Sequence, residues 1–371
     1  TVLANPVELQ RVLATARWQR DAKGWHVQTD RVQIESEDLE ASGTFTLKRE
    51  GDSAPVVDLN LQFANGDVAR ASRYYPTGMH ENLRNWLTMA LRGGRLEQGE
   101  FVLAGPLDRF PFRDGSGRFE TRFDVSDLTL RYREDWPELT QMRAAVRFDG
   151  PGMDIEVSDG RLFDTRLESG RVRIADFRRP LLEVRAKASG PLADGLRYMA
   201  QSDVARRQAE SMALVEASGP ARLDLSLDIP LARKLNRELE LEGLVALDGV
   251  SLDVPAAALK IRELTGPLRF TRHTLEARGI TGRLHDAAIR VDATRPAKGD
   301  ILISATGAFP ANEMLAPYAP TIARHLAGQS DWFVHLNLPV ASGGRTEVNL
   351  ASGFEGVSVA LPAPLGKAEQ E

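Results

Sequence analysis

The six histidines are the residues best suited to hold a metal ion, and their spacing matches no metal motif. They are His26, His80, His273, His285, His325 and His335. No two have the i, i+4 spacing of a zinc-binding helix or the short spacing of a zinc finger. The chain has no cysteine, which excludes disulfides and thiolate metal sites. We therefore predict no metal site and no cofactor.

Catalytic motifs are equally scarce. Asp114-Gly115-Ser116-Gly117 contains a serine between glycines, but it is not a G-x-S-x-G nucleophile turn, and a hairpin turn is the better interpretation. The chain has no phosphate-binding glycine motif. Asp and Glu mostly alternate with apolar residues, which is typical of the solvated face of a sheet. We predict no catalytic residue and no enzymatic activity. A pair of carboxylates brought together by the fold, as glycoside cleavage requires, stays an open alternative.

Basic residues form two pairs, Arg178-Arg179 and Arg206-Arg207. Such pairs can contact anionic lipid head groups, although they are more often solvated turns or helix faces. The net charge is -5, with Lys and Arg spread among Asp and Glu. A nucleic-acid partner favours a concentrated basic face, so we expect none.

The elements that position these residues are strands, because apolar and polar residues alternate with period two. The pattern is sustained over 94–174, where Phe119, Phe123 and Val125 point one way. Past Ser126-Asp127 the parity shifts, and Leu128 and Leu130 take over the apolar side. Short turn signals separate the runs, which predicts antiparallel neighbours. These signals are Asp114-Gly115, Asp149-Gly150-Pro151-Gly152, Asp159-Gly160 and Ser169-Gly170.

Helical spacing interrupts the strands in three inserts, near 77–91, 192–216 and 311–327. The third insert is broken by Pro317 and Pro320. A short helix is also expected within 1–16, after Asn5-Pro6, because Pro is favoured at the first helical position.

The number of strands raises the question of what covers their apolar face. We count about eighteen alternating runs, and open sheets rarely exceed about ten strands without curling or splitting. A sandwich or closed barrel buries that face against other strands. A curled open sheet instead leaves an aliphatic trough. A strand of six residues is about 20 Å long, which is comparable to an extended long acyl chain. Burying such a chain is favourable by on the order of 10 kcal/mol. The pattern alone leaves both arrangements open.

The composition, with 42% hydrophobic and 27% charged residues, is that of a folded chain. It contains no apolar run of about 18 residues, the length that crosses a bilayer as a helix. It begins at Thr1 and has a charged tail from Lys367 to Glu371. We therefore expect a fragment of a larger protein, whose targeting or anchoring signals lie elsewhere.

A set of landmarks in fixed order resembles the YhdP-type AsmA-like proteins of the Gram-negative envelope. No single landmark is specific, and together they extend from about Tyr74 to Lys367. They are Trp86-Leu87, Ala90-Leu91, Gly99, Gly105-Pro106-Leu107, Phe110-Pro111-Phe112, Gly117, Phe119, Val125, Leu130-Arg131-Tyr132, Trp136-Pro137, Phe148, Met153, Gly328-Gln329-Ser330-Asp331-Trp332 and Leu361-Pro362-Ala363-Pro364-Leu365-Gly366-Lys367.

The resemblance implies a long, curled, antiparallel meander sheet with an apolar groove, a mainly β fold in which 1–371 form one elongated fragment. It also implies a periplasmic location within an inner-membrane-anchored protein. The implied function is non-enzymatic transfer of phospholipid between inner and outer membrane, with contact to both membranes made by parts outside this fragment.

We expect aliphatic residues of the later strands to line the groove. The alternative is a structural or scaffolding envelope protein with a closed core. The expected lining residues are Leu223, Leu225, Leu227, Leu239, Leu241, Val245, Leu252, Ile261, Ile289, Ile301 and Ile303.

Overall fold

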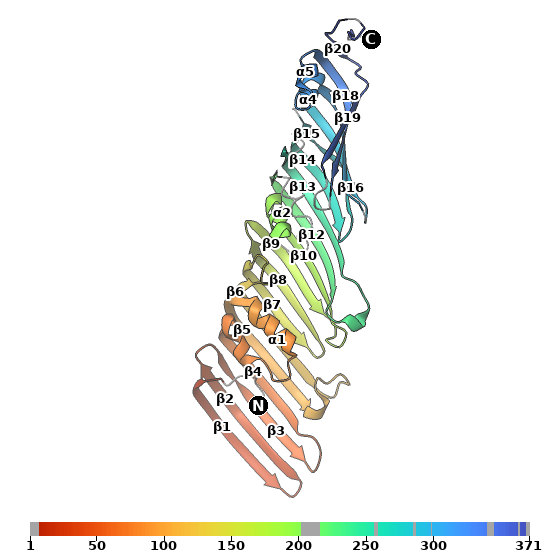
Figure 1. Ribbon diagram of the computed structural model, residues 1–371. Coiled ribbons are helices and arrows are strands. Elements are labelled where there is room, and N and C mark those ends of the chain that lie inside the picture. The colour runs from red at the N-terminus through yellow and green to blue at the C-terminus, as the bar shows by residue number, and fades with distance from the viewer. Residues whose placement is uncertain are drawn as a thin grey trace. The chain divides into compact units, whose positions relative to one another are not determined.

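A computed structural model describes residues 7–201, 216–255, 259–284, 287–297, 299–339, 345–362 and 364–368. Its strands form one long antiparallel sheet of 20 strands that is not closed, with a few short helices (Figure 1). The predicted mainly β, antiparallel fold is confirmed, and a closed barrel is not what forms. Among the described residues, no helix is both long and apolar enough to cross a bilayer.

The chain divides into two compact units. Unit 1 comprises Thr1–Lys187 and Ser226–Leu239. Its consecutive strands from β1 to β9 pair as an antiparallel meander. The elements that begin in this unit are β1 (Leu9–Asp21), β2 (Gly24–Ser36), β3 (Glu40–Glu50), β4 (Val56–Asp67), η1 (Val68–Tyr74), α1 (Glu81–Ala90), β5 (Leu91–Pro106), η2 (Leu107–Arg109), β6 (Arg118–Leu130), β7 (Leu139–Asp149), β8 (Gly152–Leu162), β9 (Thr165–Ile174), β10 (Leu181–Pro191) and η3 (Arg233–Leu235).

Unit 2 comprises Ala188–Leu225 and Glu240–Glu371. Its strands from β13 to β19 also pair in chain order. The elements that begin in this unit are α2 (Leu192–Gln201), β11 (Glu216–Ser218), β12 (Pro220–Pro230), β13 (Glu240–Val254), β14 (Leu259–Thr271), β15 (Leu275–Leu284), β16 (Ala287–Arg295), β17 (Ile301–Pro310), α4 (Ala311–Leu315), α5 (Pro320–Ala323), β18 (Leu326–Leu338), β19 (Glu347–Ser352) and β20 (Val357–Val359).

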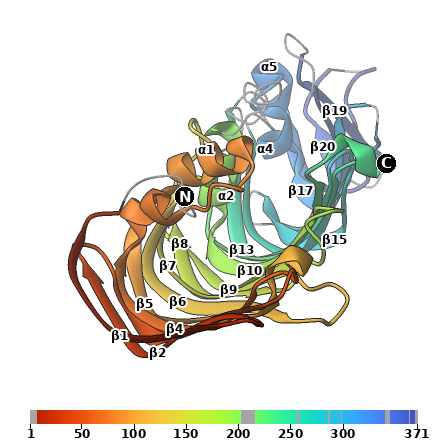
Figure 2. The same ribbon diagram turned by 90° about the horizontal axis from the view of Figure 1, so that it is seen from below.

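Described helices occur within each of the three predicted inserts. The first contains α1, which leads directly into β5 of unit 1 (Figure 2). The second begins with α2, and its residues 202–215 lie outside the described residues. The third contains α4 and α5, which are separated at Pro317; Pro320 opens α5. A proline in the first turn of a helix costs no backbone hydrogen bond, so Pro320 can begin α5. Pro317, by contrast, interrupts the helical segment that starts with α4.

The expected helix within 1–16 is wrong where the structure describes it. Residues Leu9–Asp21 form strand β1, paired with β2 from Leu9 opposite Ser36 to Asp21 opposite Gly24. Ala14, Ala16 and Trp18 alternate with polar residues, which suits a strand. Hydrogen bonding to a neighbouring strand outweighs the local signal of one proline.

Two of the four turn signals are also misread. Asp114-Gly115 lies between β5 and β6, and Gly150-Pro151 lies between β7 and β8. Asp159-Gly160, however, lies inside β8, and Ser169-Gly170 lies inside β9. These two glycines provide space rather than a turn. A Cβ on Gly160 would lie 3.1 Å from Met142 Cγ, and one on Gly170 would lie 3.2 Å from Val157 Cβ.

The predicted parity shift at Ser126-Asp127 is confirmed. Asp127 has φ 48°, and the pairing of β6 with β7 shifts register between Val125 and Leu128, as in a β-bulge. Other strands also contain residues with positive φ that the strand pairing skips, and together with Asp127 these form what we call the bulge set. Its members are Asn65, Gly94, Asp127 and Gln141 in unit 1, and Gly249, Glu263 and Gly279 in unit 2.

Candidate functional site

The pairing register gives unit 1 one continuous apolar face. Leu61 lies opposite Phe101, and Phe123 opposite Val146. Because directly opposed residues of an antiparallel sheet share a face, the apolar side chains form rows that cross the strands. One such row contains Phe63, Gly99, Phe123, Val146, Ile155 and Val172.

This apolar face of unit 1 is only partly covered. Val125, Leu128 and Met142 are buried, where Val68 of η1 packs on them. Further along the same strands, Phe123 and Ile155 are half-buried. These side chains touch neighbours on their own face and retain area open to another apolar molecule.

Unit 2 has an equivalent apolar face that is more deeply buried. One of its rows is Val245, Leu268, Ala277, Ala293, Ile303, Leu336 and Val348. Trp332 and Phe309 are 2% and 0% exposed, and Met314 of α4 is buried in the same cluster. Helix α4 and its neighbours therefore fill part of this face with the protein's own side chains.

The structure brings six of the eleven predicted lining residues into this one apolar cluster of unit 2. They are Val245, Leu252, Ile261, Ile289, Ile301 and Ile303. Ile289 is 4% exposed, whereas the other ten residues of the predicted set are half-buried. Leu239 lies in the loop before β13, outside any strand. Leu227 and Leu239 belong to unit 1, and the other nine to unit 2.

The predicted set leaves out the aromatic part of the face in unit 1. Phe101 and Phe119 pack edge to face at 5.9 Å between ring centres, and Phe119 contacts Phe110 at 5.1 Å. Phe148 stacks on Phe177 at 6.3 Å. The alternating phenylalanines of β5 to β7 were the sequence signal for these residues. The aliphatic alternation after residue 221 is more regular, and the predicted lining residues follow that pattern instead of the phenylalanines.

A hollow of about 920 Å³ lies in unit 1, on the polar side of the sheet. Asp154, Glu156 and Arg171 line the hollow. Their sequence neighbours Ile155 and Val172 point to the apolar side and do not line it. Phe63, Phe123 and Val146 of the apolar row also border the hollow, so it adjoins both the polar side chains and part of that row.

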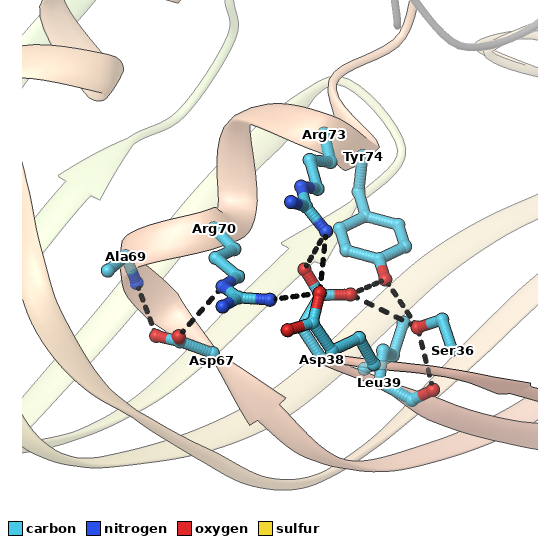
Figure 3. A network of polar contacts seen from close by, with 9 residues as sticks. Ser36, Asp38, Leu39, Asp67, Ala69, Arg70, Arg73 and Tyr74 are labelled. Atoms are coloured by element: carbon cyan, nitrogen blue, oxygen red, sulfur yellow. Dashed lines mark hydrogen bonds and ion pairs between the residues drawn. The ribbon is translucent and has the colours of Figure 1, made fainter. Parts of the chain in front are cut away.

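A polar network holds η1 against the hairpin of β2 and β3 (Figure 3). Asp38 is 5% exposed, and its Oδ1 accepts hydrogen bonds from the Tyr74 hydroxyl at 2.6 Å and from Ser36 Oγ at 3.1 Å. Its Oδ2 lies 3.2 Å from Arg73 Nη1. Burial raises the pKa of Asp38, but these hydrogen bonds and the Arg73 charge outweigh burial and hold the pKa below its ordinary value.

This network fixes the segment that covers the apolar face. Asp67 caps η1 by accepting a hydrogen bond from the Ala69 N–H at 2.9 Å, and it lies 3.5 Å from Arg70 Nε. Arg70 also pairs with Glu37 at 2.6 Å. Because Val68 begins η1, the same contacts position Val68 on the buried apolar residues of the face.

A second carboxylate, Glu120, is buried on the polar side of β6. It binds Arg122 through Nε, Arg118 through Nη2 at 2.5 Å, and lies 3.3 Å from Arg147 Nε of the neighbouring strand. The hydrogen bond from Arg122 is the largest influence. Together with Arg118 it outweighs burial and lowers the pKa of Glu120 to about 2. This group is ionised at neutral pH and acts as a structural anion.

The residues weighed for catalysis occupy ordinary positions. Ser116 donates a hydrogen bond to Asp114 Oδ1 at 2.5 Å in the loop between β5 and β6. No group of three or more His, Asp or Glu within the described part of the chain is placed to hold a metal ion. Arg178 and Arg179 lie in the loop between β9 and β10, while Arg206 and Arg207 fall outside the described residues.

Comparison with known proteins gives one family. The family model described as YhdP protein matches residues 1–371. The curated intermembrane phospholipid transporter YhdP of Escherichia coli (strain K12) is 24% identical over 374 residues, which cover 99% of this chain and 29% of that protein. The chain thus spans less than a third of the length of this relative. No solved structure matches.

Proposed function

The chain belongs to the YhdP protein family, and we propose from this membership and from its apolar face that it carries phospholipid acyl chains. In this proposal it acts as a non-enzymatic segment of a conduit. The name of its relative, an intermembrane phospholipid transporter, supports phospholipid as the cargo. We further propose a location in the periplasm between inner and outer membrane, within a longer membrane-anchored protein of a Gram-negative bacterium.

The observation that carries the proposal is the partly covered apolar face of unit 1. Phe123, Val146 and Ile155 are half-buried although they occupy the centre of a row that crosses five strand pairs. An acyl chain on these side chains gains about 0.8 kcal/mol for each methylene removed from water. The apolar face of unit 2, with the predicted lining residues, would continue the same chemistry.

The test is a pair of charge insertions that differ only in the face they occupy. Leu61→Arg with Val146→Arg places two cations on the apolar face, where no partner compensates for their burial. Gln62→Arg with Ala145→Arg places the same charges one residue away, on exposed positions of the polar side. Native mass spectrometry of the purified 371-residue chain, incubated with phosphatidylglycerol, measures bound lipid in each.

We expect bound phospholipid on the unmodified chain and on the polar-side control, and at least a tenfold loss on the apolar-face variant. Ile303→Arg with Ser304→Arg as its control applies the same test to the predicted lining of unit 2. Circular dichroism must first establish that each variant is folded. Unchanged lipid binding by folded apolar-face variants in both units would contradict the proposal.

A further inference from the structure

The loops at one end of the unit 1 strands combine exposed aromatic residues with arginines. We define this rim as residues 107–117, between β5 and β6, and residues 175–180, between β9 and β10. Phe110 is 52% exposed and Phe177 is 42% exposed. Four arginines and three aspartates lie in these two segments.

The two loops of the rim are physically joined. Arg113 binds Asp176 through two hydrogen bonds, of 2.8 and 2.9 Å. The Phe177 N–H donates to the Pro151 carbonyl at 2.9 Å, which ties the second loop to the turn between β7 and β8. The rim is thus one continuous surface across the ends of β5 to β9.

The rim adjoins the apolar face through its aromatic residues. Phe110 contacts Phe119, and Phe177 stacks on Phe148, with Phe119 and Phe148 both on the apolar face. Phe112 is buried beneath them, against Gly105 and Gly117, where any Cβ would lie within 3 Å of a neighbouring atom. An acyl chain lying along the strands therefore reaches the rim without leaving apolar surface.

The arginines of the rim retain free hydrogen-bond donors. Arg109 binds Asp114 through Nη1 at 3.1 Å, which leaves most of its five N–H groups available. Arg178 Nε lies 3.8 Å from Asp176, whose oxygens already accept from Arg113. Arg179 is exposed, and its side chain has no partner among the described residues. Arginine forks match the geometry of a phosphate group.

We propose that this rim binds the phosphate of a phospholipid whose acyl chains lie on the apolar face of unit 1. Arg109, Arg178 and Arg179 contact the phosphate, while Phe110 and Phe177 contact the first methylenes of the chains. The assignment rests on the proposed lipid-carrying function and adds a head-group site to it. The rim then orients each lipid, with its phosphate at the ends of β5 to β9.

The experiment compares two ligands with identical chains, dioleoyl phosphatidylglycerol and dioleoylglycerol, which lacks the phosphate. The rim variant is Arg109→Gln, Arg178→Gln and Arg179→Gln in the full 371-residue chain. The control variant, Arg31→Gln, Arg161→Gln and Arg290→Gln, removes the same charge from exposed strand positions outside the rim. Dissociation constants are measured by native mass spectrometry.

We expect the rim variant to bind phosphatidylglycerol about tenfold or more weakly, because hydrogen bonds to a charged group change affinity by about that factor. Its binding of dioleoylglycerol should be unchanged, and the control variant should match the unmodified chain for both ligands. If the rim variant lost affinity equally for both ligands, or lost none for either, the rim site would be refuted. The lipid-carrying function would still stand.

Two further outcomes overturn the proposal in different ways. If the unmodified chain binds neither ligand, the lipid-carrying function itself fails, and the rim site fails with it. If millimolar inorganic phosphate displaces phosphatidylglycerol from the rim, the site is a general anion site. If it does not, the phosphate is held as part of the lipid, as proposed.

Discussion

Glu120 exemplifies how the polar side of the sheet is stabilised at the level of single residues. Its carboxylate is 7% exposed, whereas the three arginines around it are 50–60% exposed. The pKa of Glu120 is lowered to about 2 in the folded chain, from the ordinary 4.5. The ion pairs thus add stability above about pH 4.5, and this contribution is lost as the pH falls toward 2.

Replacing Glu120 with Gln tests this contribution. We expect the variant to lose about 1–2 kcal/mol of stability at pH 7, a modest value because water screens the exposed arginines. The difference between variant and unmodified chain should shrink as the pH falls from about 4.5 to about 2. Urea unfolding at a series of pH values measures it; a difference independent of pH in this range would contradict the ion-pair interpretation.

The alternation pattern can place only part of the Glu120 site. Arg118 and Arg122 are two residues from Glu120, so alternation places all three on one face. Arg147 joins them only because β6 and β7 pair with Arg122 opposite Arg147. Register depends on turn length and on bulges, and the period-two pattern revealed only the bulge at Ser126-Asp127. The contact of Phe119 with Phe110 likewise depends on the fold of the loop after β5.

At the scale of elements, the bulge set decides which side chains face which way. Asp127 has φ 48°, a left-handed conformation that costs a non-glycine residue about 1–2 kcal/mol. Asp is among the residues that tolerate it best, and β-branched residues tolerate it least. The bulge therefore keeps Val125 and Leu128 on the same face, although Leu128 is three positions after Val125 and strict alternation would place it on the opposite face.

Asp127→Val should expose this constraint. We expect it to lower the free energy of unfolding by about 1–2 kcal/mol, since valine is strained at positive φ. Asp124→Val is the matched control, on an exposed position of the same strand with ordinary backbone angles. Thermal unfolding compares the two. Equal effects would mean that φ at Asp127 does not limit stability.

Element boundaries were predictable to the extent that local signals agreed with long-range pairing. Alternation gave the strands, and helical spacing gave the three inserts, of which α1 is the clearest. The errors arose where a local signal competed with the sheet, at Pro6 before β1 and at Gly160 and Gly170 inside strands. A glycine needed for close packing has the same sequence appearance as a glycine needed for a turn.

At the scale of the whole chain, two compact units differ in how their apolar faces are closed. In unit 2, Lys367 binds back to β20 and the segment that precedes it. Lys367 Nζ donates to the carbonyls of Phe354 at 3.0 Å and Val357 at 3.1 Å, and Phe354 packs on Trp332. One ammonium group thereby ties the end of the described chain to β18 through β20.

Lys367→Met removes these charged hydrogen bonds and keeps the side-chain length. We expect about 1–3 kcal/mol less local protection, because two carbonyls lose a charged donor. Amide hydrogen exchange should accelerate in β20 and the end of β18 and stay unchanged in β6 and β7 of unit 1. Lys260→Met, which breaks an exposed ion pair with Asp253, serves as control. Acceleration spread over both units would show that they do not open separately.

The bulge set also has a consequence for how substitutions are tolerated along the sequence. Within each strand, positions that accept polar residues alternate with positions that reject them. At each left-handed residue this alternation changes phase, as at Asp127 in β6, Gly249 in β13 and Gly279 in β15. A saturation-mutagenesis map of the chain would therefore record the bulges as phase shifts in tolerance. Such a map would locate the bend of each strand without any measurement of structure.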